Sequence, residues 1–328
     1  MKDRAFDPSY WEALWKQAAA SSPVARRDRY DPQEELAYWD RRAVGYDRQS
    51  RSPHSRAWRA ELLAWLASRG ALRPGFRVLD IGAGPGNFAL PLAARVRRVT
   101  ALEPAAGMAE ILRRRIKQRA LRNLDVDQRP WGEVQLEREG WSGAFDLVFA
   151  SMSPGVDGPE ALERMNRASR GFCFLGGWSG AQWGQWGQAR SELWPLLFSE
   201  PQGHYPHDVL YAFGLLYARG FRPELRFRWR ESRRDLEPGQ AEQELGQLFQ
   251  RYTPLTAAVR TRIGRYVRER TRDGRFRQAA RQCQGLLLWE VEAGLRGPGG
   301  EIKSPGRGGG AAGRASGAPR NRRPGPGG

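Results

Sequence analysis

Apolar and polar positions along the chain change their period near residue 75. Residues 57–69 (AWRAELLAWLASR) carry apolar side chains at helical spacing and stop at Gly70, which predicts a helix. Beyond Pro74 and Gly75, short apolar runs alternate with amphipathic segments, which predicts strands separated by helices. The predicted strands are 77–81, 99–102, 124–128, 145–150, 171–175, 224–232 and 285–292. The predicted helices are 88–95, 108–119, 160–169 and 207–219, with a largely helical stretch over 240–282.

Strands that alternate with helices form parallel βαβ units whose sheet is covered on both faces. We therefore expect an α/β fold with a doubly wound, mostly parallel, seven-stranded sheet. The pattern adds a helical N-terminal extension over 1–36 and a helical insertion before the last strand. Trp11 and Trp15 are four residues apart, so they share one face of a helix and are expected to pack on the main domain.

The expected domain spans residues 37–295, with cap elements at 177–205 and 236–282. Residues 296–328 contain no aromatic residue, and about half of them are Gly or Pro. Such a segment cannot bury enough apolar surface to fold, so it is expected to be a disordered, basic tail.

Composition narrows the possible classes of protein. The chain has 328 residues with a net charge of +18, and 40% of its residues are hydrophobic, which is enough to build a core. No apolar run reaches membrane-spanning length, and the N-terminus lacks the apolar region of a signal peptide. Two cysteines in apolar runs and three histidines predict neither a disulfide framework nor a metal site. We expect a cytoplasmic protein without membrane contact.

The informative motif is VLDIGAGPGNF, over residues 78–88. A strand enters a glycine-rich turn and a helix follows, so the turn allows close backbone approach and the helix start offers free N–H groups. Asp80 stands just before the turn, and Glu103 ends the second strand, where an acid can accept both hydroxyls of a ribose. Asn87 replaces the third glycine of the dinucleotide fingerprint, which disfavours a nicotinamide-dependent enzyme.

Three segments, LDIGAGPGNFALPLA, VTALEPAAGM and FDLVFASMSPGV, resemble the class I S-adenosylmethionine-dependent methyltransferases of Rossmann-like fold. The resemblance covers roughly residues 38–176 and implies S-adenosylmethionine as the cofactor. It also implies that Asp80 and the turn hold the methionine part and that Glu103 holds the ribose. The cofactor-binding residues that it implies are Tyr46, Asp80, Gly82, Ala83, Gly84, Gly86, Asn87, Glu103, Pro104, Met108, Trp131 and Ser151.

Several of these positions have a second interpretation. Met108, Trp131 and Tyr46 also suit ordinary core packing, and Ser151 and Ser153 also suit a turn. The chain has no G-x-S-x-G nucleophile motif, and methyl transfer does not require one because the cofactor carries the reactive group. Ser153, His204 and His207 are the weak catalytic candidates.

The acceptor is less well defined. The sequence Ser151-Met152-Ser153-Pro154-Gly155 lacks the Asn/Asp-Pro-Pro-aromatic signature of nucleobase amino methylation. A tryptophan-rich segment (Trp178, Trp183, Trp186 and Trp194) could line an acceptor pocket or pack as a cover of the sheet. We expect a small-molecule acceptor that is planar or anionic. RNA is the alternative, because residues 1–295 keep a charge of +12 without the tail. A non-enzymatic cofactor-binding or scaffold module is the third possibility.

Overall fold

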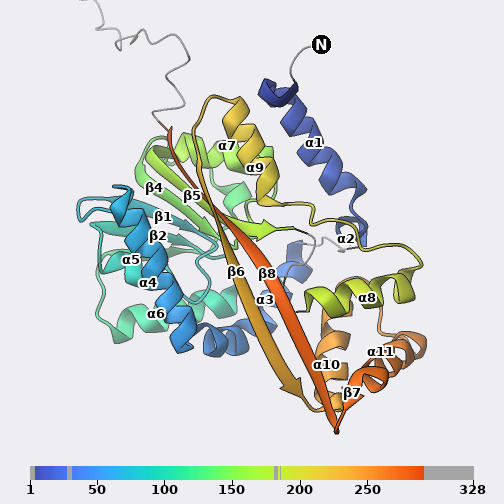
Figure 1. Cartoon of the computed structure of the whole chain (residues 1–328). Coiled ribbons are helices and arrows are strands. Elements are labelled where there is room, and N and C mark those ends of the chain that lie inside the picture. Colours follow the sequence, from blue (N-terminus) through green and yellow to red (C-terminus); the bar gives the residue numbers. More distant parts are fainter. Residues whose placement is uncertain (1–3, 28–31, 181–183, 185, 292–328) are drawn as a thin grey trace, which may run out of the picture.

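The computed structural model describes residues 4–27, 32–180, 184 and 186–291. A twisted central sheet carries helices on both faces, and two long strands run from it into a helical cap (Figure 1). The strands are β1 (Arg77–Ile81), β2 (Arg98–Leu102), β3 (Leu124–Asp127), β4 (Phe145–Ser151), β5 (Ser169–Ser179), β6 (Glu224–Leu236), β7 (Thr271–Arg272) and β8 (Arg275–Glu290). The α-helices are α1 (Pro8–Ser21), α2 (Pro23–Arg27), α3 (Pro32–Ser50), α4 (Pro53–Ser68), α5 (Ala89–Ala93), α6 (Ala106–Gln118), α7 (Pro159–Ala168), α8 (Gly187–Phe198), α9 (Val209–Ala218), α10 (Pro238–Phe249) and α11 (Ala257–Arg270).

The order of the strands indicates at which edge of the sheet a ligand would bind. The order is β3-β2-β1-β4-β5-β8-β6, in which β1 to β5 pair in parallel and β8 is antiparallel to both of its neighbours. The chain places β2 and then β3 on one side of β1, and it then crosses to the other side of β1 to form β4 and β5. The switch point therefore lies between β1 and β4. In open α/β sheets, ligands bind at such a switch point, beyond the carboxyl ends of the strands.

Both faces of the sheet are covered by apolar helix faces. On one face, α4, α5 and α6 bury leucines against the side chains of β1, β4 and β5. On the other face, α7 and α9 pack against the sheet, and α1 lies over α9. Trp15 of α1 is 2% exposed and stacks on Tyr211, so the predicted docking of the N-terminal helix is confirmed.

The cap is a separate apolar cluster at the far ends of β6 and β8. Here α8, α10 and α11 enclose Phe276 of β8, and Trp194 and Phe249 are fully buried (Figure 1). Trp186 is also buried in this cluster, which supports the packing interpretation of the tryptophan-rich segment. Trp183 lies outside the described residues.

The predicted α/β sheet is confirmed, with eight strands instead of seven because the two-residue β7 pairs with β8. The helical assignment is wrong for residues 271–282, which form β7 and most of the outer part of β8. The helical insertion before the last strand consists of α10 and α11 only. The domain boundaries stay predictions, and the tail over 296–328 lies outside the described residues. Within the described ranges, the longest helices are too short or too polar to cross a bilayer.

Candidate functional site

The glycine-rich turn leaves β1 at Ile81 and is fixed by the neighbouring strand. The backbone N–H groups of Gly82 and Ala83 both donate to the carbonyl of Leu102, at 2.8 and 2.9 Å. Gly82, Gly84 and Gly86 all have positive φ values, of 72°, 57° and 87°, and residues that carry a Cβ rarely adopt such values. The turn therefore holds a conformation that depends on glycine at three alternating positions.

Asp80 is the one acidic residue within the apolar strand β1. It is 2% exposed, and its Oδ2 has no hydrogen-bond partner among the described residues. Burial and the neighbouring Glu103 raise the pKa of Asp80 to about 8, although the backbone N–H of Ala89 at the start of α5 opposes this. An acid with an unused oxygen at this place is suited to a cationic or hydrogen-bond-donating group.

Glu103 follows β2 and points at the turn. Its Oε2 accepts from the backbone N–H of Gly84 at 2.6 Å, and its Oε1 accepts from that of Ala105 at 2.9 Å. Burial raises the pKa of Glu103 to about 7, and these two N–H groups limit the rise. The two carboxyl groups thus lie together at the carboxyl ends of β1 and β2.

Helix α3 covers the turn from outside. Tyr46 hydrogen bonds with Asn87, which also accepts from the hydroxyl of Ser50 at 2.9 Å. The Tyr46 ring lies 4.0 Å from the position that a Cβ on Gly84 would take. On the same side, Arg115 of α6 pairs with Asp47 and donates to the carbonyl of Pro85 at 2.9 Å. These contacts hold α3 against the turn, with Tyr46 over Gly84.

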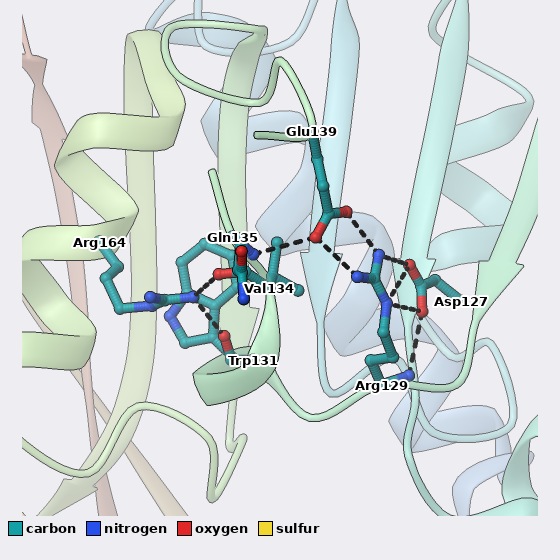
Figure 2. A network of polar contacts seen from close by, with 7 residues as sticks. All are labelled: Asp127, Arg129, Trp131, Val134, Gln135, Glu139 and Arg164. Atoms are coloured by element: carbon teal, nitrogen blue, oxygen red, sulfur yellow. Dashed lines mark hydrogen bonds and ion pairs between the residues drawn. The ribbon is translucent and has the colours of Figure 1, made fainter. Parts of the chain in front are cut away.

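The loop after β3 is fixed by two arginines (Figure 2). Arg129 donates to Asp127 and Glu139, with the shortest N–O distance 2.6 Å to each, and lowers the pKa of both carboxyl groups. Arg164 of α7 donates to the carbonyls of Trp131 and Val134, and its guanidinium lies over the indole of Trp131 (Figure 2). The loop is therefore held from both ends.

The end of β4 is the third side of the site. Ser153 lies against Gly82, since a Cβ on Gly82 would be 2.3 Å from the Ser153 hydroxyl oxygen. Met152 has a φ of 57°, in the left-handed region. Gln284 of β8 donates to the sulfur of Met152 at 3.5 Å and accepts from Arg228 at 3.1 Å. A polar chain therefore leads from the end of β4 to β6.

Other predicted cofactor residues lie around this edge and are engaged in packing or strand pairing. Met108 and Ala105 pack with α3 in a small apolar cluster, and Trp131 is 3% exposed and donates to the carbonyl of Ala161. Pro104 is half-buried beside Glu103, and Ser151 pairs in register with Gly176 of β5. Their contacts with the cofactor stay predictions.

Of the three catalytic candidates, Ser153 lies at the glycine turn and the two histidines lie elsewhere. His204 is exposed, and His207 accepts from the indole N–H of Trp15 at 3.4 Å, under α1. Their catalytic roles, and that of Ser153, stay predictions. Sequence reasoning missed Arg228, Gln284 and His54, because contacts between β6, β8 and α4 leave no local motif. Arg228 lies 3.2 Å from the His54 ring nitrogen Nε2 and stacks over Trp58.

Part of the chain is similar to known methyltransferases. Residues 78–170 match the family model described as a methyltransferase domain. The 23S rRNA (uracil(1939)-C(5))-methyltransferase RlmD of Pseudomonas fluorescens is 34% identical over 43% of this chain and 38% of its own length. The protein-L-isoaspartate O-methyltransferase of Methylorubrum populi is 39% identical over 31% of this chain and 46% of its own. A solved structure, magnesium protoporphyrin IX methyltransferase from Synechocystis, has a TM-score of 0.47 and 14% identity over 79% of this chain and 99% of that chain.

The chain spans less than half the length of the curated relatives that it matches first. The matched segment contains the glycine turn, both buried acids and the end of β4. Residues 78–170 thus form a methyltransferase domain of the Rossmann-like, S-adenosylmethionine-dependent class, and the expected resemblance is confirmed. The cofactor of this class is S-adenosylmethionine.

The residues of the site fit this cofactor. S-adenosylmethionine carries a positive sulfonium and an amino group, and the site offers two buried carboxyl groups with raised pKa values. Asp80 keeps an unpartnered oxygen for a donor, and the Cβ-free side of Gly84 has only Tyr46 within 4 Å. Asp80 and the turn would hold the methionine part, and Glu103 would hold the ribose.

Proposed function

We propose that this protein is an S-adenosylmethionine-dependent methyltransferase that acts on a small anionic acceptor. The observation that supports the proposal best is the buried acid pair, Asp80 and Glu103, at the carboxyl ends of two parallel strands around a glycine turn. Burying two carboxyl groups together is costly unless a cation is bound between or beside them. A positively charged cofactor relieves this cost when it binds.

The cofactor brings the activated methyl group, so the protein has to position the reactants and exclude water. Tyr46 on α3 would cover the cofactor, and its contact with Asn87 would fix the angle of its ring. The fixed loop after β3 would form the wall on the adenine side. Because the positive charge of the sulfonium is lost during transfer, a site of low polarity favours the reaction.

An anionic acceptor is supported by guanidinium groups near Tyr46. The charges of Arg59 and Arg230 both act on Tyr46, and burial lowers the pKa of Arg59 and of Arg228. Half-buried guanidiniums recognise carboxylate or phosphate oxygens in a fixed geometry. A carboxylate oxygen is already a nucleophile, so methylation of such an acceptor requires no general base.

RNA is the second candidate for the acceptor. It is supported by the basic charge of residues 1–295 and by the names of the RlmD relatives. Methylation of a uracil carbon needs a nucleophile to activate the ring, and thiolate is the usual kind of group. Cys173 and Cys283 are both buried, and burial raises the pKa of each thiol. These observations favour a small anionic acceptor over uracil-C5 chemistry.

Calorimetric titration with S-adenosylmethionine and S-adenosylhomocysteine tests the cofactor site. We expect Asp80→Asn and Glu103→Gln each to weaken S-adenosylmethionine binding by about 10- to 100-fold, or roughly 1–3 kcal/mol. Glu269→Gln, which removes an exposed carboxylate on α11, is the matched control and should bind normally. Wild-type protein without measurable binding at millimolar cofactor would contradict the proposal.

Turnover distinguishes an enzyme from a binding module. A set of carboxylate- and phosphate-bearing acceptors, each paired with its neutral ester, should show methylation of the charged member only. Arg228→Gln should raise KM for that acceptor more than it lowers kcat. Methylation of RNA but of no small acid would favour the second candidate, and binding of the cofactor without any turnover would favour a scaffold module.

A further inference from the structure

A hollow lies at the amino ends of β1, β2 and β3, at the edge of the sheet opposite the glycine turn. It has a volume of about 450 Å³ and is lined by Arg77, Arg97, Arg98, Arg122 and Asn123. All four arginines are exposed. We refer to it as the arginine hollow. No role in the proposed methyl transfer accounts for it, because no residue of the cofactor site lines it.

Its place in the fold separates it from the cofactor site. Arg77 and Arg98 are the first residues of β1 and β2 and pair in register, and Arg122 and Asn123 immediately precede β3. Since these strands are parallel, their amino ends share one edge, whereas the glycine turn follows the carboxyl end of β1. Five residues at roughly 3.3 Å each put about 15 Å between the two edges. A ligand in the arginine hollow therefore does not take part directly in methyl transfer.

The backbone that carries the arginines is held in place by hydrogen bonds. The N–H groups of Arg97 and Arg98 both donate to the carbonyl of Phe76, at 2.9 and 3.3 Å. The Asn123 amide donates to the carbonyls of Ala93 and Val96, and the Asn123 carbonyl accepts from Val99. The loops cannot easily separate the arginines to reduce their mutual repulsion.

Few acids compensate this charge. Asp125 pairs with Arg98 at 2.7 Å, and Asp146 near Arg77 is paired with Arg170. Arg77 itself lies over the ring of Phe145. Arg97 and Arg122 form no ion pair within the described parts of the chain. Four guanidiniums thus share one hollow with one directly paired carboxylate, an arrangement that a bound polyanion would stabilise.

We propose that the arginine hollow is a binding site for phosphate groups. Guanidinium forks match the tetrahedral oxygens of phosphate, and several forks around one hollow suit a ligand with more than one negative charge. A single carboxylate would leave most of the charge uncompensated. The phosphates come either from a small molecule that carries a diphosphate or from the backbone of RNA, and both offer adjacent phosphate groups.

The test uses the full-length protein and a double variant, Arg97→Ala with Arg122→Ala. The matched control, Arg265→Ala with Arg272→Ala, removes the same charge from exposed positions on α11 and β7, at the far end of the molecule (Figure 1). Inorganic pyrophosphate is titrated by calorimetry, and fluorescently labelled single-stranded RNA by anisotropy over a series of salt concentrations. S-adenosylmethionine binding is measured on every variant to show that the fold is intact.

We expect the hollow variant to bind pyrophosphate at least 10-fold more weakly than both wild type and the control. If RNA is the source, the hollow variant should also bind the labelled RNA more weakly. The slope of the logarithm of the binding constant against the logarithm of the salt concentration should then become shallower by about 0.7 for each lost phosphate contact. Loss of pyrophosphate binding alone would assign a small phosphate ligand. The proposal is overturned if wild type binds neither probe, or if the hollow variant and the control lose affinity equally.

Discussion

Asp80 and Glu103 illustrate how single residues reveal the site. Asp80 is an acid within a buried apolar strand and Glu103 directly follows another, and each has a raised pKa in the structure. The sequence showed their types and spacing, so their convergence could be predicted. Their hydrogen bonds could not, because the contact of Glu103 with the Gly84 N–H depends on how the turn folds back toward β2.

The raised pKa of Asp80 makes both stability and binding depend on pH. Its folded pKa of about 8 exceeds the ordinary aspartate value of 3.8, so the folded protein favours the protonated acid. Without ligand, the free energy of unfolding should therefore fall as pH rises from about 4 to 8. Binding of the cationic cofactor favours the carboxylate, so the cofactor affinity should rise over pH 6 to 8. Thermal shift with and without S-adenosylmethionine measures both effects.

Asp80→Asn supplies the control for this pH dependence, since an amide does not titrate. The variant should lose a large part of the pH dependence of cofactor-induced stabilisation, and Glu103 should account for the remainder. A wild-type thermal shift that is constant between pH 6 and 8 would show that neither acid changes its protonation on binding.

The glycines of the turn should respond differently to alanine. Gly82→Ala adds a Cβ 2.3 Å from the Ser153 oxygen at a positive φ, so we expect a stability loss of roughly 2–4 kcal/mol. Gly84→Ala meets only the Tyr46 ring at 4.0 Å and should cost about 1–2 kcal/mol from its φ alone. Chemical denaturation measures both changes.

The double variant Gly82→Ala with Ser153→Gly removes the main clash and should recover part of the stability. Gly84→Ala should instead weaken cofactor binding, because its Cβ enters the space beside Tyr46. Equal stability losses for the two single variants would show that contact with Ser153 does not restrict Gly82.

At the scale of elements, α1 and α9 depend on one close approach. The indole of Trp11 lies against Gly214, where a Cβ would be only 2.3 Å from the ring. In a helix, glycine to alanine normally stabilises by about 0.5–1 kcal/mol. Here we expect Gly214→Ala to destabilise the protein by about 1–3 kcal/mol, because the Trp11 ring has to move and the packing of α1 against α9 is disturbed.

Gly246→Ala on α10 is the matched control, since its Cβ would meet Leu255 at an ordinary 3.6 Å. It should stabilise the protein. Urea unfolding of both variants gives the comparison, and an increase in stability for Gly214→Ala would mean that Trp11 does not limit the approach of the two helices.

The elements of the sheet were predictable where apolar side chains fill the buried positions. The strands β1 to β5 and the helices α5 to α7 begin within a few residues of their predicted starts. The outer part of β8 was not predictable, because its alternation places Gln278, Ala280 and Gln282 at buried positions, with two arginines and an alanine exposed among them. Because two of these three buried positions are glutamines, the period of two gives little hydrophobic signal, and pairing with β6 and β7 defines the strand.

At the scale of the whole molecule, β8 joins the cofactor domain to the cap. Its C-terminal half lies between β5 and β6 and buries Leu286 and Leu288 in the sheet, and its N-terminal half buries Phe276 among α8, α10 and α11. One continuous strand therefore contributes to the apolar clusters on both faces of the sheet and to the cluster of the cap. Contacts that the sequence separates by more than 100 residues, such as Gln284 with Met152, depend on this strand.

This continuity predicts that the cap and the sheet unfold together. Phe276 is 1% exposed, so Phe276→Ala should cost about 3–5 kcal/mol, and the loss should appear in the whole structure. Hydrogen exchange measured by mass spectrometry should show amides of α10, α11, β1 and β4 losing protection by similar factors in the variant. The strand shared by the sheet and the cap transmits the loss, because its outer half continues directly into Gln284, which contacts Met152 at the end of β4. Exchange that accelerates in α10 and α11 while β1 and β4 keep their wild-type protection would show instead that the cap opens independently of the cofactor site.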